Sequence, residues 1–322
     1  MTPPDAGEGP AVLAVLVSWN SARHLADALA SLPPGVPAVV VDNGSTDGSA
    51  EVAEAAGARV IRAGQNLGFG PACNLGASAV ASSRAVLLLN PDAALVDGEA
   101  TIAALLSALD GDPAVAAAAP ALSGDGQELF QLRRLPTLGS LAREAFLFNR
   151  LRPQNRGLRR ERYLDRPRDV PFDAEQPAAA ALLVRREVWE ELDGFDPAFA
   201  PAWFEDVDLC ARIRERGWRV RFVPSAKATH VGGTTMKSLP YRDFLPLYTR
   251  NLFRYLDRHA RLPGQAGARA VLLVGTLLRL LLVAVGVRGD HAGGDAATAY
   301  LRVLRGLLGL GWVTALAPTE RR

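Results

Sequence analysis

Short apolar runs alternate with helix-like segments along the first part of the chain. The apolar runs cover residues 11–17, 38–41, 59–61 and 85–89, and segments with helical spacing follow the first three, ending near residues 32, 56 and 80. Strands that are apolar along their whole length and alternate with helices indicate a parallel sheet covered on both faces. The pattern therefore predicts an α/β fold, with a mostly parallel twisted sheet between two layers of helices.

The regular pattern weakens between residues 120 and 177 and then returns. The weaker stretch is Arg-rich and interrupted by prolines, and it includes Arg133, Arg134 and residues 156–162. Beyond it we expect a strand at 178–184, helices at 186–192 and 206–216, and a strand at 219–223 that leads to His230. The second helix should end at Gly217, because glycine commonly follows the last turn of a helix. The core is thus expected to resume after residue 177.

Acidic side chains follow two of the predicted parallel strands. Asp42 opens the turn after the second strand, and Asn90-Pro91-Asp92 follows the fourth. Ligands bind beyond the carboxyl ends of the strands in such sheets, so both carboxylates should face one cleft. Glu205 and Asp206 lie at the start of a later predicted helix. These positions make the three aspartates the central candidate residues.

The chemistry of these residues suits a nucleotide diphosphate and a hydroxyl group. Asp42 can accept a hydrogen bond from the imide N–H of a pyrimidine, and Asp92 is a hard oxygen ligand for Mg²⁺ or Mn²⁺. His230 could complete the metal shell. Asp206, preceded by Glu205, is the candidate general base; neighbouring aromatic residues and the helix N-terminus act on its pKa in opposite directions, so the net shift stays open.

Each candidate has a simpler interpretation when it is taken alone. Asp42 could only form a turn, Asp92 could form a turn or a helix N-cap, and Asp206 could be an N-cap. His230 could be a hydrogen-bonded structural histidine, and Cys73 and Cys210 are expected to be small core residues. The ordered set of carboxylates favours the functional interpretation.

Several segments together resemble family 2 glycosyltransferases. They are VSWNSARHLADALASL, VVVDNGSTDGS, NLGFGPACNLG, LLLNPDA and LDGFDPAFAPAWFEDVDLCARIRERGW, followed by His230. The resemblance covers residues 12–233 and is strongest to bacterial rhamnosyltransferases. It implies a GT-A fold, an inverting displacement and a divalent cation, Mg²⁺ or Mn²⁺.

The resemblance also assigns roles to individual residues. It places Asp42 at the nucleotide base, Asp92 at the metal and diphosphate, Asp206 in the role of general base and His230 at the metal. A further set matches a loop near the donor: Asn66, Gly68 and Asn74. Asn90 departs from the family pattern, because a neutral amide stands at the first position of the usual DxD motif. An ion held by one carboxylate and one imidazole would be bound less tightly.

The implied reaction moves a sugar, with rhamnose from dTDP-rhamnose as the best candidate, to a cell-envelope glycan or a lipid-linked acceptor. A sugar nucleotidyltransferase would have a similar sheet, but it normally carries a Gly-rich basic loop after the first strand, where this chain has Ser18-Trp19-Asn20-Ser21. A catalytically inactive membrane-associated scaffold is a second alternative, which Asn90 favours and Asp206 argues against.

The composition limits the classes of binding partner and the cellular compartment that we expect. A chain of 322 residues with a net charge of +2 lacks the strong basic excess of a nucleic-acid binder, so no nucleic-acid partner is expected. Two cysteines far apart in sequence fit a cytoplasmic protein.

We expect a flexible leader at residues 1–10, a catalytic domain at 11–240 with a donor half (11–119) and an acceptor half (120–240), and a helical region at 241–322.

The C-terminal region contains an apolar run at residues 270–287, which is borderline for a membrane span. On a helix, Arg269, Thr276, Arg279 and Gly286 fall loosely on one side, which suits a helix lying on the inner face of the cytoplasmic membrane. A second Leu- and Gly-rich stretch follows at 300–316. The alternative is that both helices pack on the catalytic domain or form a homodimer contact.

Overall fold

The computed structural model describes residues 10–124, 129–232, 239–260, 262–287 and 293–313, so all but the last residue of the predicted leader lies outside the described residues. The chain divides into two compact units. Unit 1 comprises Met1–Arg134 and Arg166–Gly232, and unit 2 comprises Leu135–Asp165 and Gly233–Arg322. Residues 135–165, which belong to the predicted acceptor half, therefore group with the C-terminal helices.

The first half of unit 1 follows the predicted alternation of strands and helices. Its strands are β1 (Val12–Ser18), β2 (Ala38–Asp42), β3 (Arg59–Arg62) and β4 (Ala85–Leu89), which pair in parallel in the order β3-β2-β1-β4. The connecting helices are α1 (Ala22–Ala30), α2 (Ser49–Ala55) and α3 (Phe69–Ser78). The predicted elements are thus confirmed, with small shifts at their ends.

The second half of unit 1 extends this sheet. Its strands are β5 (Ala93–Leu95), β6 (Val115–Ser123), β8 (Phe172–Ala174), β10 (Ala181–Arg185) and β11 (Arg219–His230). Within the described residues the sheet has nine strands, in the order β3-β2-β1-β4-β10-β6-β11-β5, with β8 paired to β11. Strand β10 is antiparallel to β4 and β6, whereas β11 is parallel to β6. A small second sheet joins β7 (Leu132–Arg133) and β9 (Gln176–Pro177).

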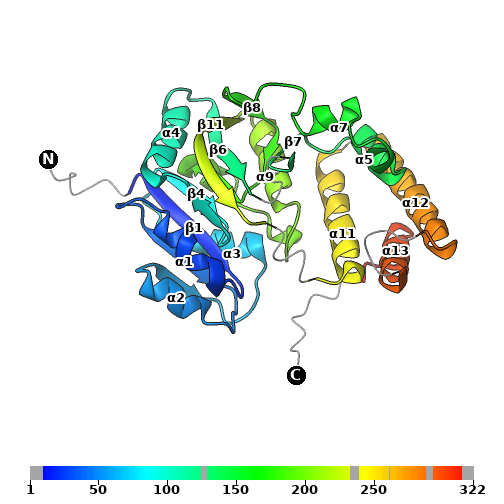
Figure 1. The fold of residues 1–322 in the computed structure, drawn as a ribbon, viewed down its shortest axis with the longest axis horizontal. Coiled ribbons are helices and arrows are strands. Elements are labelled where there is room, and N and C mark those ends of the chain that lie inside the picture. Colours follow the sequence, from blue (N-terminus) through cyan, green and yellow to red (C-terminus); the bar gives the residue numbers. More distant parts are fainter. Residues whose placement is uncertain (1–9, 125–128, 233–238, 261, 288–292, 314–322) are drawn as a thin grey trace, which may run out of the picture. The chain divides into compact units, whose positions relative to one another are not determined.

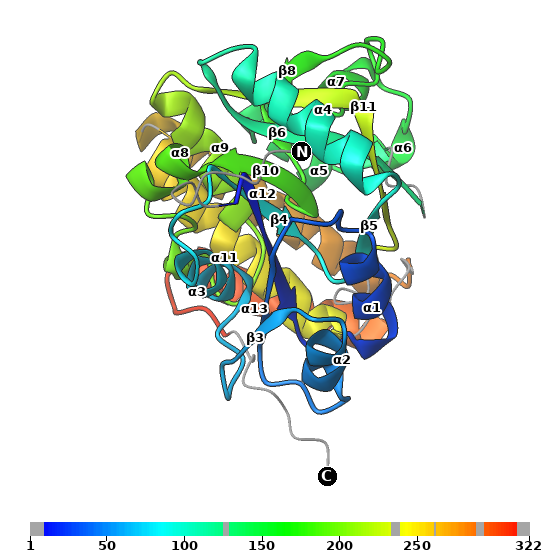
Figure 2. The ribbon, with the colours of Figure 1, turned by 90° about the vertical axis from the view of Figure 1, so that its left-hand side faces the viewer.

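Helices cover both faces of the large sheet. Leu25, Ala53 and Leu105, from α1, α2 and α4 (Gly98–Asp110), pack on one face, and side chains of α3, α8 (Arg186–Glu191) and α9 (Glu205–Glu215) pack on the other. Figure 2 shows the two helix groups on opposite sides of the strands. Both cysteines are buried and free, as expected for core residues. Burial on both faces explains why the strands are apolar along their whole length.

Unit 2 is helical. It contains α5 (Leu138–Ala145), α6 (Phe148–Leu151), α7 (Arg156–Glu161), α11 (Tyr241–His259), α12 (Leu262–Ala284) and α13 (Gly293–Leu307). Helix α12 packs against α5, α11 and α13 (Figure 1). Among the described residues, one helix is long and apolar enough to cross a membrane, over Gly264–Ala284. The end of the predicted stretch at 300–316 lies outside the described residues.

Candidate active site

Asp42 lies at the carboxyl edge of the parallel sheet. It is the last residue of β2, it is buried, and it pairs in register with Ser18 at the end of β1. Within the described part of the chain, its carboxylate accepts one hydrogen bond, from Ser45 N–H at 3.3 Å. The buried hydroxyl of Ser18 has no hydrogen-bond partner among the same residues. This edge therefore offers two polar groups with capacity for further hydrogen bonds.

The carboxylate of the neighbouring Asp47 accepts hydrogen bonds that hold the turn in place. It accepts hydrogen bonds from Ala22 N–H at 3.0 Å and from the backbone and hydroxyl of Ser49. Burial alone would raise its pKa, but these hydrogen bonds outweigh it and lower the pKa. Asp47 thus closes the turn, while Asp42 remains the candidate for ligand binding.

Asn66 and Gly68 belong to a loop that joins the β2 turn to the segment before α9. Asn66 Oδ1 accepts hydrogen bonds from Asn43 Nδ2 and from Gly68 N–H, both at 2.9 Å. Gly68 has a φ of +91°, and a Cβ there would come within 2.8 Å of Pro201 Cα. Phe69 N–H donates to Pro201 O at 2.7 Å. Only glycine allows this close approach, so the loop links the Asp42 edge to the segment just before α9, the helix that begins with Glu205 and Asp206.

Asn90, Asp92 and His230 converge at the end of β4. Asp92 Oδ1 lies 3.2 Å from His230 Nε2, and the side-chain amide of Asn90 lies 3.4 Å from the same ring nitrogen. Strand β5 follows Asp92 directly and pairs with the end of β11, which brings residues far apart in sequence together. Both β2 and β4 flank β1 in parallel, so Asp42 and Asn90 leave the sheet at the same edge, about 10 Å apart by strand spacing.

Asp92 and His230 fit one side of a divalent cation site. A carboxylate oxygen and an imidazole nitrogen are both common ligands, and both side chains are largely shielded from solvent. No group of three or more His, Cys, Asp or Glu side chains at metal-binding spacing occurs in the described ranges. The protein would therefore supply a partial ligand set, and oxygens of a bound diphosphate would have to complete it.

Glu205 and Asp206 open α9, as predicted. The two residues before them, Trp203 and Phe204, have φ values of +71° and +74°, which is a strained conformation for non-glycine residues. Glu205 is buried, and its Oε2 has no hydrogen-bond partner within the described residues. Burial raises the pKa of Glu205 well above its usual range, and the nearby charge of Asp206 raises it further. This carboxyl group therefore favours its protonated form.

Asp206 has a raised pKa but keeps partners for its charge. Burial raises the pKa, and it is opposed by hydrogen bonds from the backbone of Val207 and Ala179 and by the positive charge of Arg133. The direction that the sequence left open is thus upward, because desolvation outweighs these contacts. A carboxylate of raised basicity at the start of a helix is suited to remove a proton from a hydroxyl group.

Two residues that position Asp206 were not predicted. Gln176 donates a hydrogen bond from Nε2 to Asp206 Oδ2 at 3.1 Å, and it pairs across the small β7–β9 sheet with Arg133. Both residues lie in the stretch where the periodic pattern is weak. The one available signal was the Arg133-Arg134 pair, and nothing local indicated which arginine faces the site: Arg134 instead pairs with Glu175 at 2.8 Å.

Asn74 and Asp208 fix the backbone near the site through hydrogen bonds and an ion pair. Asn74 donates to Phe195 O at 2.7 Å and accepts from Phe195 N–H at 2.9 Å. Asp208 is fully buried and pairs with Arg212, whose other N–H groups donate to Leu192 O and Gly194 O. Both contacts meet at the turn after α8. The contacts of Asn74 are those of a residue that fixes this turn, and its predicted place near the donor stays a prediction.

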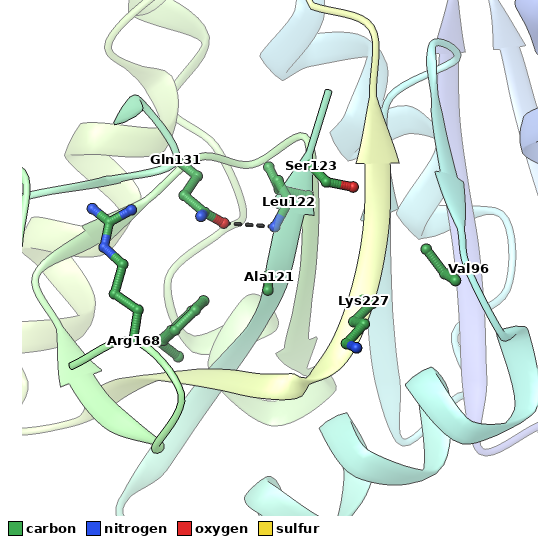
Figure 3. Close-up of a pocket in the computed structure, with 8 residues that line it drawn as sticks. Val96, Ala121, Leu122, Ser123, Gln131, Arg168 and Lys227 are labelled. Atoms are coloured by element: carbon green, nitrogen blue, oxygen red, sulfur yellow. Dashed lines mark hydrogen bonds between the residues drawn. The ribbon is translucent and has the colours of Figure 1, made fainter. Parts of the chain in front are cut away.

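A separate pocket of about 310 Å³ lies on the sheet near the end of β6 and the middle of β11 (Figure 3). Its lining residues are Val96, Ala121, Leu122, Ser123, Gln131, Arg168, Phe222 and Lys227. Gln131 Oε1 accepts a hydrogen bond from Leu122 N–H at 2.6 Å, which fixes one wall. None of these residues is among the predicted site residues. The pocket is therefore distinct from the carboxylate cluster.

Residues 10–255 match the model of the family described as glycosyltransferase like family 2. The chain belongs to this family. This glycosyltransferase is 31% identical, over 294 residues, to an N-acetylglucosaminyl-diphospho-decaprenol L-rhamnosyltransferase of Mycobacterium tuberculosis, in both the CDC 1551 and H37Rv strains. The alignment covers 82% of this chain and 93% of each relative. The predicted family and its rhamnosyltransferase likeness are confirmed, and the nucleotidyltransferase alternative is not supported.

Solved structures show that the glycosyltransferase has the predicted GT-A fold. A mannosyltransferase from Pyrobaculum calidifontis in complex with GDP-Man and Mn²⁺ aligns with a TM-score of 0.55, 15% identity and coverage of 96% of this chain and 85% of that one. Glucosyl-3-phosphoglycerate synthase from Mycobacterium tuberculosis aligns with a TM-score of 0.51, 18% identity and coverage of 78% and 80%. At these identities the likeness concerns the fold alone.

Proposed function

We propose that this glycosyltransferase transfers rhamnose from dTDP-rhamnose to a lipid-linked N-acetylglucosaminyl diphosphate, with inversion at the anomeric carbon. The likeness to the mycobacterial rhamnosyltransferase supports the donor and acceptor classes. Asp42, at the sheet edge, would accept a hydrogen bond from the imide N–H of the thymine base. The observation that carries the mechanism is the basic, hydrogen-bonded carboxylate of Asp206 at the start of α9.

In the proposed step, Asp206 takes the proton of the acceptor hydroxyl. The hydroxyl oxygen forms a bond to the anomeric carbon of the donor, and the bond from that carbon to the diphosphate oxygen breaks. The nucleoside diphosphate leaves with the electron pair of the broken bond. A single displacement of this kind inverts the configuration. Gln176 orients Asp206 through its hydrogen bond, and the positive charge of Arg133 favours the ionised form of Asp206. Burial favours the protonated form of Glu205, which limits the negative charge beside Asp206.

Asp92 and His230 would hold the divalent cation, Mg²⁺ or Mn²⁺, with Asn90 beside them. When bound, the cation would supply positive charge to the departing diphosphate. The Mn²⁺ complexes of fold relatives are consistent with such an ion. Because the described residues supply two strong ligands there, Asp92 and His230, we expect the ion to bind mainly together with the nucleotide.

We further propose that the enzyme works in the cytoplasm at the inner face of the membrane, because a lipid-linked acceptor is confined to a membrane. The apolar helix α12 supports this location. A homodimer remains a separate proposal that light scattering would test.

Release of the nucleoside diphosphate tests the proposal. The native chain is incubated with Mn²⁺ and a panel of activated sugars, with and without an N-acetylglucosaminyl-diphospho-lipid. We expect acceptor-dependent release from dTDP-rhamnose, reduced about 10²- to 10⁴-fold in Asp206→Asn. Asp193→Asn, which alters an exposed carboxylate in the turn after α8, is the matched control. Equal acceptor-dependent release by Asp206→Asn would remove Asp206 from the base role, and release from a different donor would overturn the choice of rhamnose.

A further inference from the structure

Helix α12 of unit 2 presents a row of apolar side chains to solvent. Val274, Leu277, Leu281 and, just beyond the helix end, Val285 are between 46% and 66% exposed. They are spaced three or four residues apart, so they fall on one face of the helix. Gly275 and Arg279 fall on the opposite face, which packs on α5. Helix α12 is therefore an amphipathic surface helix of unit 2 whose outer face is apolar.

The inner face of α12 is fixed to α5, a helix that carries the charged residues Arg143 and Glu144. A Cβ on Gly275 would lie 2.7 Å from Ala145 Cβ, and one on Gly267 would lie 3.3 Å from the side chain of Leu138, so α5 and α12 run side by side in the same direction. Arg279 donates to the carbonyl oxygens of Glu144 and Ala145. If α12 crossed a bilayer in this arrangement, it would carry Glu144 and the rest of α5 into the hydrocarbon at high cost. The contacts instead suit a helix lying in the plane of the membrane surface.

The segment that contains α5 supplies positive charge to unit 2. Residues 135–165 contain seven arginines and three acidic residues. A pocket of about 690 Å³ opens there, lined by Arg143, Arg152 and Arg156 together with Phe148, Pro153, Gln154, Asn155 and Gly157. Arg143 donates to Glu161 at 2.7 Å, but its buried Nε has no hydrogen-bond partner in the described part of the chain. The pocket is thus built to receive an anionic group.

Exposed apolar side chains adjoin the pocket. Phe148 lies in its lining, and Leu151, at the end of α6, is 76% exposed. Helix α6 begins just after Ala145, where Arg279 of α12 is anchored. Apolar groups and an excess of arginines over acidic residues therefore occur together on unit 2, which is the combination that an anionic lipid surface attracts.

We propose that unit 2 docks on a bilayer that contains anionic phospholipids, with the outer face of α12 at the boundary of head groups and acyl chains and the arginine-lined pocket on lipid phosphates. The docking surface rests on the proposed function, because it is the surface through which the enzyme would meet a lipid-linked acceptor. The docking itself is a binding property that is measured without turnover.

Flotation of the full chain with vesicles tests the proposal. We expect binding to phosphatidylcholine vesicles that contain phosphatidylglycerol, and much weaker binding to phosphatidylcholine alone. Leu277→Glu/Leu281→Glu should weaken binding to both vesicles at least tenfold. Arg152→Gln/Arg156→Gln should lower the affinity for anionic vesicles about thirtyfold, because each arginine contributes about 1 kcal/mol to binding near an anionic surface. The affinity of this variant for phosphatidylcholine vesicles should not change. Val170→Glu and Arg23→Gln, exposed residues of unit 1, are the matched controls and should bind as the native chain does.

Four outcomes would overturn the inference. Binding that is unchanged in both double variants would exclude this surface. Retention in the membrane after alkaline carbonate washing would show that α12 crosses the bilayer. Release by inorganic pyrophosphate, beyond that caused by sodium chloride of equal ionic strength, would assign the pocket to a free phosphate. If the chain does not bind vesicles but forms a dimer that Leu277→Glu/Leu281→Glu abolishes, the apolar row of α12 contacts a second copy of the chain instead. In every case, sugar transfer to a water-soluble acceptor analogue reports the proposed function separately.

Discussion

Gln176 Nε2 donates a hydrogen bond to Asp206 Oδ2 at 3.1 Å, across a separation of 30 residues. The contact joins the small β7–β9 sheet to the first turn of α9, and it places Arg133, the strand partner of Gln176, where its charge acts on the same carboxylate. The basicity of Asp206 is therefore set by residues outside its own segment.

Replacement of Arg133 should change the pH dependence of transfer. The charge of Arg133 lowers the pKa of Asp206, so Arg133→Gln should raise that pKa. Because the base must be ionised, the rising limb of kcat/KM should move to higher pH, and the rate well above the limb should change less. Arg134→Gln is the control, since Arg134 pairs with Glu175. A limb that moves equally in both variants would mean that the effect is only one of overall charge.

Asn90→Asp should tighten cation binding. The new carboxylate would lie beside Asp92 and His230 and add a second hard oxygen ligand. We expect the Mn²⁺ concentration for half-maximal nucleotide release to fall about tenfold, with a parallel change in Mn²⁺ affinity measured by calorimetry in the presence of nucleoside diphosphate. His230→Ala should shift both values in the opposite direction. If neither variant alters Mn²⁺ affinity, the ion does not bind at these residues.

Asn74→Ala should affect stability more than donor affinity. Its amide makes both hydrogen bonds to the backbone of Phe195, so truncation should lower the free energy of unfolding by about 1–3 kcal/mol in urea titrations. Ser78→Ala, which removes an exposed hydrogen bond on the same helix, should change it by less than about 0.5 kcal/mol. A large rise in KM for the donor with unchanged stability would instead show that Asn74 contacts the nucleotide-sugar.

Glu205→Gln should reduce the loss of stability at high pH. Burial raises the folded-state pKa of Glu205, so between its unfolded and folded pKa values the native state binds more protons than the unfolded state. Stability therefore falls as pH rises through that window and stays low above it. Denaturation midpoints at pH 5 and pH 8 should differ more for the native chain than for Glu205→Gln. Glu187→Gln, at an exposed position of α8, should retain the native difference.

The Ala-rich strand β6 shows where sequence patterns were insufficient. Its sequence, VAAAAPALS, contains small residues with low strand preference and a proline, so the pattern between residues 115 and 123 did not indicate a central strand. Yet β6 pairs with both β10 and β11, and it carries the register that brings His230 to the end of the sheet. Pairing with strands far along the chain decided this element, since Ala118 pairs with Leu183 and Val115 pairs with Arg219.

By itself, the sequence determined the α/β class, the order of the strands and helices before residue 90, and the positions of Asp42, Asp92, Glu205 and Asp206 at element ends. These features are local, because apolar periodicity and turn residues act over a few positions. The tertiary structure decided which groups meet: His230 with Asp92, Gln176 and Arg133 with Asp206, and Asn74 with Phe195. It also decided the net direction of the pKa shifts, because desolvation depends on burial by segments that lie far away in the chain.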